Sequence, residues 1–398
     1  MRAVHDHRSR PSAAKPAAVR ANPPAFAWLL ALVVALNVVG LVMVLSASSV
    51  QSLRETGSTW STFLRQLTWL GLGTLALGLT VSLDYRRWRR FIPVLLLASV
   101  AALVAVLIPG VGSRINGARS WIGVGPLTFQ PSEVAKLALL LFTADLLARR
   151  SHRMADGRAT MRPILVVSGV VVVLIMLQPD LGSTIVLGSV VLAVLFVSGV
   201  PLLPLASVTA VGAAASLGLA LSRPYRRDRL LSFLHPSADP SNTGYQGNQS
   251  LMGVASGRLT GVGLGESRAK YGFLPNAHTD FIFAIVSEEL GLVGAVAVVM
   301  LFVAFAYWGV RAALAAPDRF GTLVAAGITA WVLTQAFVNI GGVVGVLPIT
   351  GLTLPFVSFG GTSLLVTMAA TGILLNIARQ GRIRSGTRAG QKASARTA

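Results

Sequence analysis

The feature that most constrains this chain is a series of long apolar runs that contain no charged residue. Residues 29–52 form one such run and residues 183–222 form another. About 20 apolar residues are enough to cross the hydrocarbon core of a bilayer as an α-helix. Because the runs are continuous rather than alternating, they indicate helices and not the strands of a membrane β-barrel. The sequence therefore predicts a polytopic helical membrane protein and excludes a soluble globular domain.

The distribution of basic residues supports the same architecture. The formal net charge is +20, which on a soluble protein would suggest nucleic-acid binding. Here most basic residues fall into groups that alternating helices would place on one side of the membrane, as the positive-inside rule describes. These groups are Arg2, Arg8, Arg10, Lys15 and Arg20; Arg86, Arg87, Arg89 and Arg90; Arg149, Arg150, Arg153, Arg158 and Arg162; Arg311 and Arg319; and Arg379, Arg382, Arg384, Arg388, Lys392 and Arg396. The charge is thus explained without a nucleic-acid partner.

The apolar runs predict an all-α fold with about ten spans. The expected spans are 26–47, 64–82, 91–109, 127–147, 163–178, 183–199, 202–222, 281–310, 321–344 and 361–379. An even number of spans places both termini on the same side of the membrane, and the basic groups indicate that this side is the cytoplasm. The membrane domain then covers residues 25–379, and the basic, Ala-, Ser- and Gly-rich segments 1–24 and 380–398 are expected to be disordered tails. The chain has no cysteine, which excludes disulfides and thiolate metal sites.

Three longer connections are expected outside the cell membrane. They cover residues 109–126, residues 223–280 between the seventh and eighth helices, and residues 348–360. A loop as long as 223–280 is usually functional or disordered. It contains a G-x-G-x-G sequence at 261–265, but no strand precedes these glycines, so they indicate flexible backbone that could approach a phosphate rather than a dinucleotide site.

The first polar motif is the segment 130–136, which contains Gln130, Pro131, Ser132, Glu133 and Lys136. Polar residues at membrane depth are candidate functional residues. Glu133 and Lys136 are three residues apart, so they share a helix face and can pair. The pair either neutralises itself as a structural ion pair, or Lys136 presents a cation to an anionic ligand at the outer end of its helix.

The second polar motif is the tight outer turn at 178–183, which contains Asp180. Aspartate is a common N-cap residue. Asp180 therefore either caps the following helix or contacts a ligand.

The third polar motif joins His278, Thr279 and Asp280 to the acidic pair Glu288 and Glu289. Asp280 precedes an apolar helix and could cap it. His278 alone is typical of a structural hydrogen-bonding group. Together these groups form a candidate site at the outer membrane face, in which Asp280 acts as a general base or a metal ligand.

The fourth polar motif covers residues 351–363 and contains Ser358 and Gly360. It is rich in Gly, Pro and aromatic residues directly before the last span. Irregular backbone at membrane depth is tolerated where it lines a cavity. The segment is either a plain re-entrant loop or part of a binding site.

In this order, these motifs resemble the SEDS family of bacterial membrane proteins, which includes FtsW, RodA and SpoVE. The resemblance covers about residues 26–379 and is carried by 130–136, 244–250, 278–283 and 355–363. Residues 41–48 and 115–119 are more similar to the FtsW division type than to RodA. Two positions depart from the family pattern: Ser120 precedes Trp121 where a basic residue is common, and Asn276 stands where glutamate is common.

The resemblance implies a ten-helix peptidoglycan glycosyltransferase in the cytoplasmic (inner) membrane at the division septum. It implies lipid II as substrate, a class B penicillin-binding protein as partner, and contacts with other divisome proteins and membrane lipid. The family's essential aspartate falls on Asp280, and its paired lysine and glutamate fall on Lys136 and Glu133, so these three are the expected catalytic residues. The expected substrate-binding residues are Arg119, Trp121, Gln130, Ser132, Asp180, Gln246, His278, Thr279, Glu288, Glu289, Ser358 and Gly360.

The expected reaction needs a base for the attacking sugar hydroxyl and positive charge for the pyrophosphate leaving group. Asp280 is the expected base, and attack opposite the leaving group inverts the anomeric carbon. The available cations are Lys136, Arg119 and the group Arg223, Arg226, Arg227 and Arg229. The sequence leaves open whether a divalent cation, Mg²⁺ or Mn²⁺, binds through Asp280. A lipid II flippase and a non-catalytic divisome scaffold are the alternatives; polar groups at the outer face rather than the midplane favour the enzyme.

Overall fold

The computed structural model describes residues 23–115, 118–124, 127–151, 157–221, 233 and 244–381. Its α-helices are α1 (Pro23–Thr56), α2 (Ser61–Ser82), α3 (Trp88–Leu107), α4 (Pro131–Arg149), α5 (Gly157–Leu177), α6 (Leu181–Val197), α7 (Leu202–Leu221), α9 (Tyr245–Ser256), α10 (Ile282–Ala315), α11 (Arg319–Val343) and α12 (Gly361–Gln380). Two short 3₁₀ helices, η1 (Tyr85–Arg87) and η3 (Ala269–Tyr271), and three strands, β1 (Gly112–Ile115), β2 (Ala118–Val124) and β3 (Leu127–Phe129), complete the described elements.

Each predicted span coincides with one of the long helices, and α9 is an additional helix inside the 223–280 segment. Six of the described helices, α1, α3, α5, α10, α11 and α12, are long and apolar enough to cross a membrane, and α6 and α7 are shorter apolar helices. The helical membrane class is confirmed, and the number of ten crossings stays a prediction. The tails predicted to be disordered lie almost entirely outside the described residues.

The outer loop predicted at residues 109–126 contains short strands that the sequence did not indicate. There β1, β2 and β3 form a small antiparallel sheet in the order β1-β2-β3, with a register shift between Ser113 and Arg114. The expected helix start at 127 is wrong for the same reason, because Leu127–Phe129 pairs with β2. Helix α4 begins at Pro131, since proline is favoured in the first turn of a helix, where its missing N–H costs nothing.

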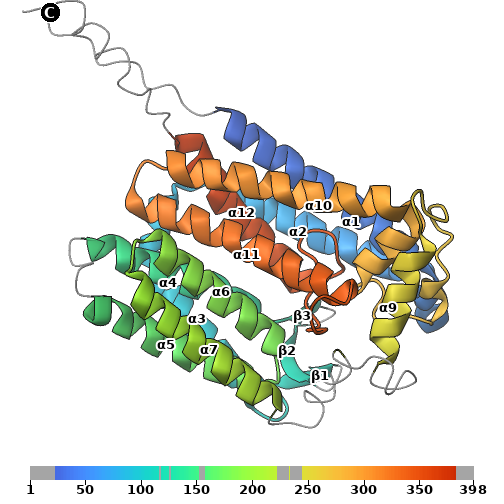
Figure 1. The fold of residues 1–398 in the computed structure, drawn as a ribbon, viewed down its shortest axis with the longest axis horizontal. Coiled ribbons are helices and arrows are strands. Elements are labelled where there is room, and N and C mark those ends of the chain that lie inside the picture. Colours follow the sequence, from blue (N-terminus) through green and yellow to red (C-terminus); the bar gives the residue numbers. More distant parts are fainter. Residues whose placement is uncertain are drawn as a thin grey trace, which may run out of the picture.

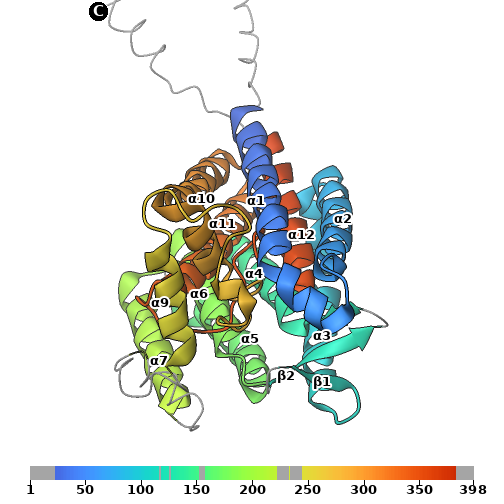
Figure 2. The ribbon, with the colours of Figure 1, turned by 90° about the vertical axis from the view of Figure 1, so that its right-hand side faces the viewer.

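The chain alternates between two ends of the bundle. Figure 1 shows α3–α7 on one side and α1, α10, α11 and α12 on the other, with the sheet and α9 at the same end. We call this end, which carries the sheet, α9 and residues 257–281 and 344–360, the loop end. Figure 2 shows the molecule with the loop end toward the viewer. The opposite end holds the start of α1, η1, the turn at 316–318 and the end of α12, and we call it the tail end.

The centre of the bundle is formed by α4, α11 and α12. Most side chains of these three helices are buried, and α11 packs against α4, α6, α10 and α12. Several of the buried side chains are polar, among them Glu133, Lys136, Gln335 and Asn339. Buried polar groups require partners, so the contacts of these side chains identify the site described below.

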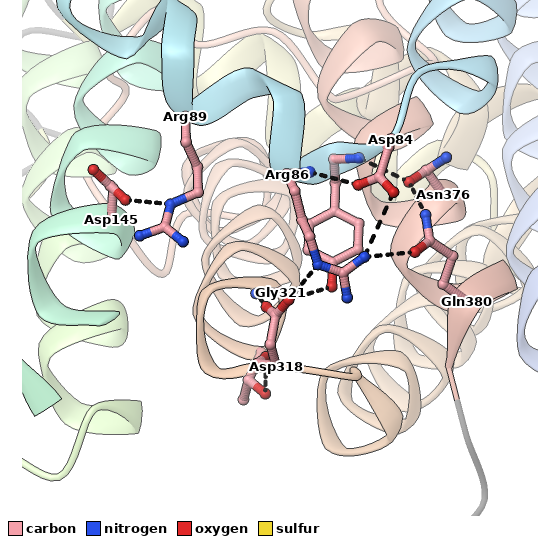
Figure 3. Close-up of polar contacts among 10 residues, drawn as sticks. Asp84, Arg86, Arg89, Asp145, Asp318, Gly321, Asn376 and Gln380 are labelled. Atoms are coloured by element: carbon pink, nitrogen blue, oxygen red, sulfur yellow. Dashed lines mark hydrogen bonds and ion pairs between the residues drawn. The ribbon is translucent and has the colours of Figure 1, made fainter. Parts of the chain in front are cut away.

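A polar cluster fastens the elements of the tail end together (Figure 3). The carboxylate of Asp318 accepts hydrogen bonds from the Tyr85 hydroxyl at 2.8 Å, from Arg86 Nε at 2.7 Å and from the Gly321 N–H at 2.8 Å. Arg86 also donates to Gln380 at 3.1 Å. The cluster therefore ties η1, the N-terminus of α11 and the end of α12 into one unit.

We expect Asp318→Ala to destabilise the protein by about 1–2 kcal/mol, because it removes the N-cap of α11. Burial acts to raise the pKa of Asp318, but the hydrogen bonds from Gly321, Tyr85 and Arg86 outweigh it and lower that pKa. A lowered folded-state pKa contributes stability above the unfolded value of about 3.9, and this contribution is lost as the pH falls through the folded-state pKa. Thermal melting in detergent should show the Ala variant losing more than Asp318→Asn, which can still cap; equal melting of all three proteins would contradict the assignment.

Candidate functional site

The side chains of Glu133 and Lys136 form an ion pair inside the bundle. Lys136 Nζ lies 2.9 Å from Glu133 Oε1 and donates to Gln335 Oε1 on α11 at 3.2 Å. The ring of Trp331 lies 5.1 Å from the same ammonium. The side chain of Lys136 is 0% exposed. Burial removes the hydration of its ammonium group, and these partners compensate for that loss.

The structure thus contains the ion pair that the sequence allowed, and it places Lys136 within the packed helices rather than on an open surface. Glu133 Oε2 is buried and has no hydrogen-bond partner among the described residues. Removing either Glu133 or Lys136 would leave the other as an unpaired charge inside the bundle, which is energetically costly. The side chain of Lys136 therefore influences the rest of the protein through the residues it contacts, Glu133, Gln335 and Trp331.

One face of α11 connects this ion pair to the loop end. Trp331, Gln335 and Asn339 are spaced four residues apart, so they line up along the helix. Gln335 Nε2 donates to the carbonyl of Thr353 at 3.0 Å, and Asn339 Nδ2 donates to the carbonyl of Leu352 at 2.6 Å. Two successive carbonyls of the 348–360 segment are thus held by one helix face.

Gln335 and Asn339 fall in none of the four polar motifs of the sequence. The available signal was the presence of two amides four residues apart in an otherwise apolar helix. Their partners were not predictable, because the contacts join α11 to segments that lie elsewhere in the chain.

Asp280 lies at the end of the same polar face. Asn339 Nδ2 donates to the Asp280 backbone carbonyl at 2.8 Å. The N-cap residue of α10 is Phe281, whose side chain makes no capping hydrogen bond. Asp280 thus directly precedes the N-cap of α10.

Asp280 lines a small pocket together with Asn339, Thr350 and Gly351. The pocket volume is about 10 Å³, which is room for about one water-sized group. Gly351 has a positive φ of 74°, and a Cβ atom there would lie 3.6 Å from Asp280 Oδ2. The carboxylate thus lies against the bend of the 348–360 segment, and Asp280 itself is only partly buried.

Residues 354–359 are fastened to the residues before Asp280. The Ser358 hydroxyl donates to the Thr279 carbonyl at 2.5 Å and accepts from the Leu354 N–H at 2.8 Å. The Phe359 N–H donates to the His278 carbonyl at 2.9 Å. The predicted site residues His278, Thr279, Asp280 and Ser358 are therefore brought together.

His278 does not supply a cation to this site at neutral pH. Burial lowers its pKa below the ordinary value of 6.5, with a smaller opposing effect from Glu55. Its ring lies 5.6 Å from the ring of Phe359. The imidazole therefore contributes packing and a neutral polar edge.

Asp180 is the N-cap of α6, as one of the two sequence interpretations held. Its Oδ1 accepts from the Ser183 N–H at 2.9 Å. Its Oδ2 accepts from Gln130 Nε2 at 3.1 Å and from the Ser132 hydroxyl at 3.4 Å. Three predicted substrate-binding residues thus bond to one another and join the starts of α4 and α6.

Glu288 and Glu289 hold a different segment, residues 265–270. Glu288 Oε2 accepts from the Ser267 hydroxyl at 2.5 Å. Glu289 Oε1 accepts from the Ser46 hydroxyl on α1 at 2.6 Å and lies 3.8 Å from Lys270 Nζ. These carboxylates therefore anchor the loop end to α1 and α10.

The glycines at 261–265 serve the same anchoring. The N–H groups of Val262 and Gly263 donate to the carbonyls of Glu288 and Glu289, at 2.9 Å and 3.1 Å. A Cβ atom on Gly261 would lie 2.1 Å from the Glu289 carbonyl oxygen. Close packing of residue 261 against the kink of α10 at Gly291 explains why residue 261 is a glycine. A bound phosphate is not needed to explain it.

The other predicted site residues also lie at the loop end, on separate elements. Arg119 and Trp121 are on β2, and Arg119 donates to the Leu107 carbonyl at 3.4 Å. Gln246 is on α9, and Gly360 is the N-cap of α12. The basic residues Arg223, Arg226, Arg227 and Arg229 fall outside the described residues.

The residues around Asp280 do not form a metal site built by the protein alone. In the described ranges, no group of three or more His, Cys, Asp or Glu side chains lies together as a metal-binding cluster. Asp280 could supply one oxygen ligand. The chemistry available from the described residues is that of a carboxylate base supported by a buried amide and ammonium network.

Comparison with known proteins extends over nearly the whole chain. Residues 27–383 match the family of cell cycle proteins that comprises FtsW, RodA and SpoVE. Stage V sporulation protein E of Bacillus subtilis is 42% identical over 86% of this chain and 94% of its own length. A probable peptidoglycan glycosyltransferase FtsW of Mycobacterium tuberculosis is 43% identical over 89% of this chain and 68% of its own length.

Two solved structures share the fold. A chain from a study of polymerisation and crosslinking by a peptidoglycan synthase complex has a TM-score of 0.71 and 34% identity, with 88% of this chain and 96% of that chain covered. The rod shape-determining protein RodA of Thermus thermophilus has a TM-score of 0.64 and 31% identity, with 88% and 95% covered.

Proposed function

Because the chain belongs to the FtsW, RodA and SpoVE family of cell cycle proteins, we propose that it is a peptidoglycan glycosyltransferase. It polymerises lipid II at the outer face of the cytoplasmic membrane, in septal wall synthesis during division, together with a class B penicillin-binding protein and other divisome proteins. The observation that carries this proposal is the placement of Asp280. Its carboxylate lines a pocket at the loop end, and its backbone is held by the amide of Asn339.

The basic residues support this orientation of the bundle. Arg86, Arg89, Arg149 and Arg319 lie at the tail end, where both ends of the described chain are found. The positive-inside rule assigns this end to the cytoplasm. The loop end with Asp280 then faces outwards, where the saccharide of a lipid-linked donor would be.

The proposed reaction is a single displacement. The acceptor sugar hydroxyl attacks the anomeric carbon of the donor, and its proton passes to the Asp280 carboxylate. The bond between that carbon and the pyrophosphate oxygen breaks, and undecaprenyl pyrophosphate leaves with the electron pair. Attack opposite the leaving group inverts the anomeric carbon. Arg119 on β2 is an available cation for the departing pyrophosphate.

Lys136 and Glu133 act in this proposal as positioning residues. Lys136 is sealed from solvent and binds Gln335, and Gln335 holds the Thr353 carbonyl. Asn339, one helical turn further along α11, holds Leu352 and Asp280. The ion pair thereby supports the backbone that forms one wall of the Asp280 pocket.

The function is tested by incubating the purified protein and its partner with lipid II in detergent, with transpeptidation blocked. We expect glycan strands with β-linkages that a muramidase digests. Failure of the wild-type protein to make any polymer with its cognate partner would contradict the proposal. Transport of labelled lipid II across proteoliposomes, without polymer in detergent, would favour a flippase.

The orientation gives a separate prediction. Reporter fusions at Arg153 and near Arg388 should read as cytoplasmic, and a fusion near Asn242 should read as extracytoplasmic, because the basic groups retain the tail end inside. Alkaline phosphatase and a fluorescent protein form a suitable pair of reporters, since each is active on only one side. A cytoplasmic reading near Asn242 would place Asp280 on the wrong side for extracellular polymerisation.

A further inference from the structure

A groove at the tail end of α3, α4 and α5 is separate from the Asp280 site. Its cavity volume is about 620 Å³, within the roughly 300–1,000 Å³ that is usual for ligand pockets. Its walls are apolar and include Ile92, Leu96, Phe142 and Val170. Within the described part of the chain, its charged lining residues are Arg89, Asp145 and Arg149, which lie together at one end.

The charged end carries more positive than negative charge. Asp145 Oδ1 lies 2.6 Å from Arg89 Nε, and Asp145 Oδ2 lies 2.8 Å from Arg149 Nε. One carboxylate therefore joins two guanidinium groups, both of them through Nε; Figure 3 shows the Arg89 contact. The side chain of Arg149 is 61% exposed and that of Arg89 is 35% exposed. The remaining donors of both arginines are suited to an anion such as a phosphate.

The length of the groove matches one leaflet of a bilayer. Arg89 lies in the first turn of α3, and the lining continues along this helix to Val100. This stretch of helix rises by about 16 Å, which is close to half of the roughly 30 Å hydrocarbon core. With the tail end on the cytoplasmic side, as proposed above, Arg89 and Arg149 lie at the level of the cytoplasmic headgroups and Val100 lies near the bilayer centre.

We propose that this groove binds an anionic phospholipid of the cytoplasmic leaflet. An acyl chain lies along α3, α4 and α5, and the phosphate contacts Arg89 and Arg149. Any lipid chain could cover the apolar walls, but the positive end selects against a headgroup that carries its own cation. The neighbouring Arg86, Arg90 and Arg150 strengthen the attraction to an anionic surface.

The proposal is tested by native mass spectrometry of the detergent-purified full-length protein. It is titrated with phosphatidylglycerol or with phosphatidylcholine of the same acyl chains. We expect tighter binding of phosphatidylglycerol. Replacing both arginines, Arg89→Gln with Arg149→Gln, should weaken phosphatidylglycerol binding by about five- to tenfold. Phosphatidylcholine, whose phosphate is offset by its own cation, should lose less, so the preference for phosphatidylglycerol should fall. Arg149→Lys should retain most of the preference because it keeps the charge.

Matched variants separate the groove from general surface effects. Arg162→Gln, at an exposed arginine of the tail end outside the groove lining, should leave the preference unchanged. Val170→Trp should fill the groove and weaken both lipids, whereas Val38→Trp, at an exposed valine on α1, should weaken neither. If the double variant does not fold, Arg149→Gln alone must still reduce the preference by about two- to fivefold. Equal affinity of the wild-type protein for both lipids, or a preference unaffected by the Gln variants at Arg89 and Arg149, would overturn the proposal.

Discussion

Replacing Asp280 with asparagine is expected to reduce polymerisation of lipid II by a factor of about 10² to 10⁴, the range typical of losing a general base. Asparagine keeps the size of the side chain and leaves the backbone carbonyl that Asn339 binds. It removes the negative charge and the basicity. Because asparagine caps a helix about as well as aspartate, loss of a cap would not explain a fall of this size.

The measurement is glycan chain length from lipid II in detergent, with the amount of folded protein and of bound partner determined in the same preparation. Asp84→Asn, at the tail end, is the matched control and should keep full activity. Near-normal activity of Asp280→Asn would remove Asp280 from the chemistry. Repeating the assay across concentrations of Mg²⁺ and Mn²⁺ separates the roles, since recovery at high metal concentration would indicate a metal ligand instead of a base.

Replacing Lys136 is the second change with a large expected effect. Lys136→Met leaves the Glu133 carboxylate buried without its cation, which is expected to cost about 3–5 kcal/mol of stability. It also removes the donor that orients Gln335 under the Thr353 carbonyl. We therefore expect both a large drop in thermal stability and loss of most polymerisation, by at least about tenfold, as the wall of the Asp280 pocket shifts.

The double variant Lys136→Met with Glu133→Gln separates these two effects. Neutralising both partners should recover most of the stability, because no unpaired charge remains buried. Polymerisation should stay low, since Gln335 still lacks its charged partner. Lys270 forms a buried pair with Glu289 and does not line the Asp280 pocket. Lys270→Met is therefore a control for the loss of a buried ion pair, and it should lower stability more than the rate of polymerisation. Full activity of the double variant would reduce Lys136 to a structural ion pair.

The helical layout was predictable because continuous apolar runs leave few alternatives in a membrane. The small sheet at 112–129 was not, because its short strands do not show a clear alternating pattern and depend on pairing with one another. Pro131 marked the true start of α4, but the preceding apolar residues Leu127 and Phe129 extended the predicted span. The first predicted span ended at residue 47, whereas α1 continues to Thr56.

The site was predictable in part. Asp280, Thr279 and Ser358 belong to sequence motifs, and the structure brings them together. Glu288 and Glu289 follow in sequence, yet their carboxylates hold residues 265–270 instead. The amides of Gln335 and Asn339, which join Lys136 to Asp280, belong to no predicted motif. Sequence shows which side chains are polar in a span, whereas only the fold shows which distant backbone carbonyls they bind.

The central claim is that Asp280 serves glycosyl transfer at the loop end, and one paired measurement tests it most directly. Polymerisation in detergent and movement of labelled lipid II across proteoliposomes would be followed for the wild-type protein and Asp280→Asn from the same purifications. We predict polymer from the wild-type protein with its partner, a loss of about 10² to 10⁴ in the variant, and the same lipid movement for both proteins. A wild-type protein that moves lipid II but makes no polymer, with movement lost in the variant, would contradict the account.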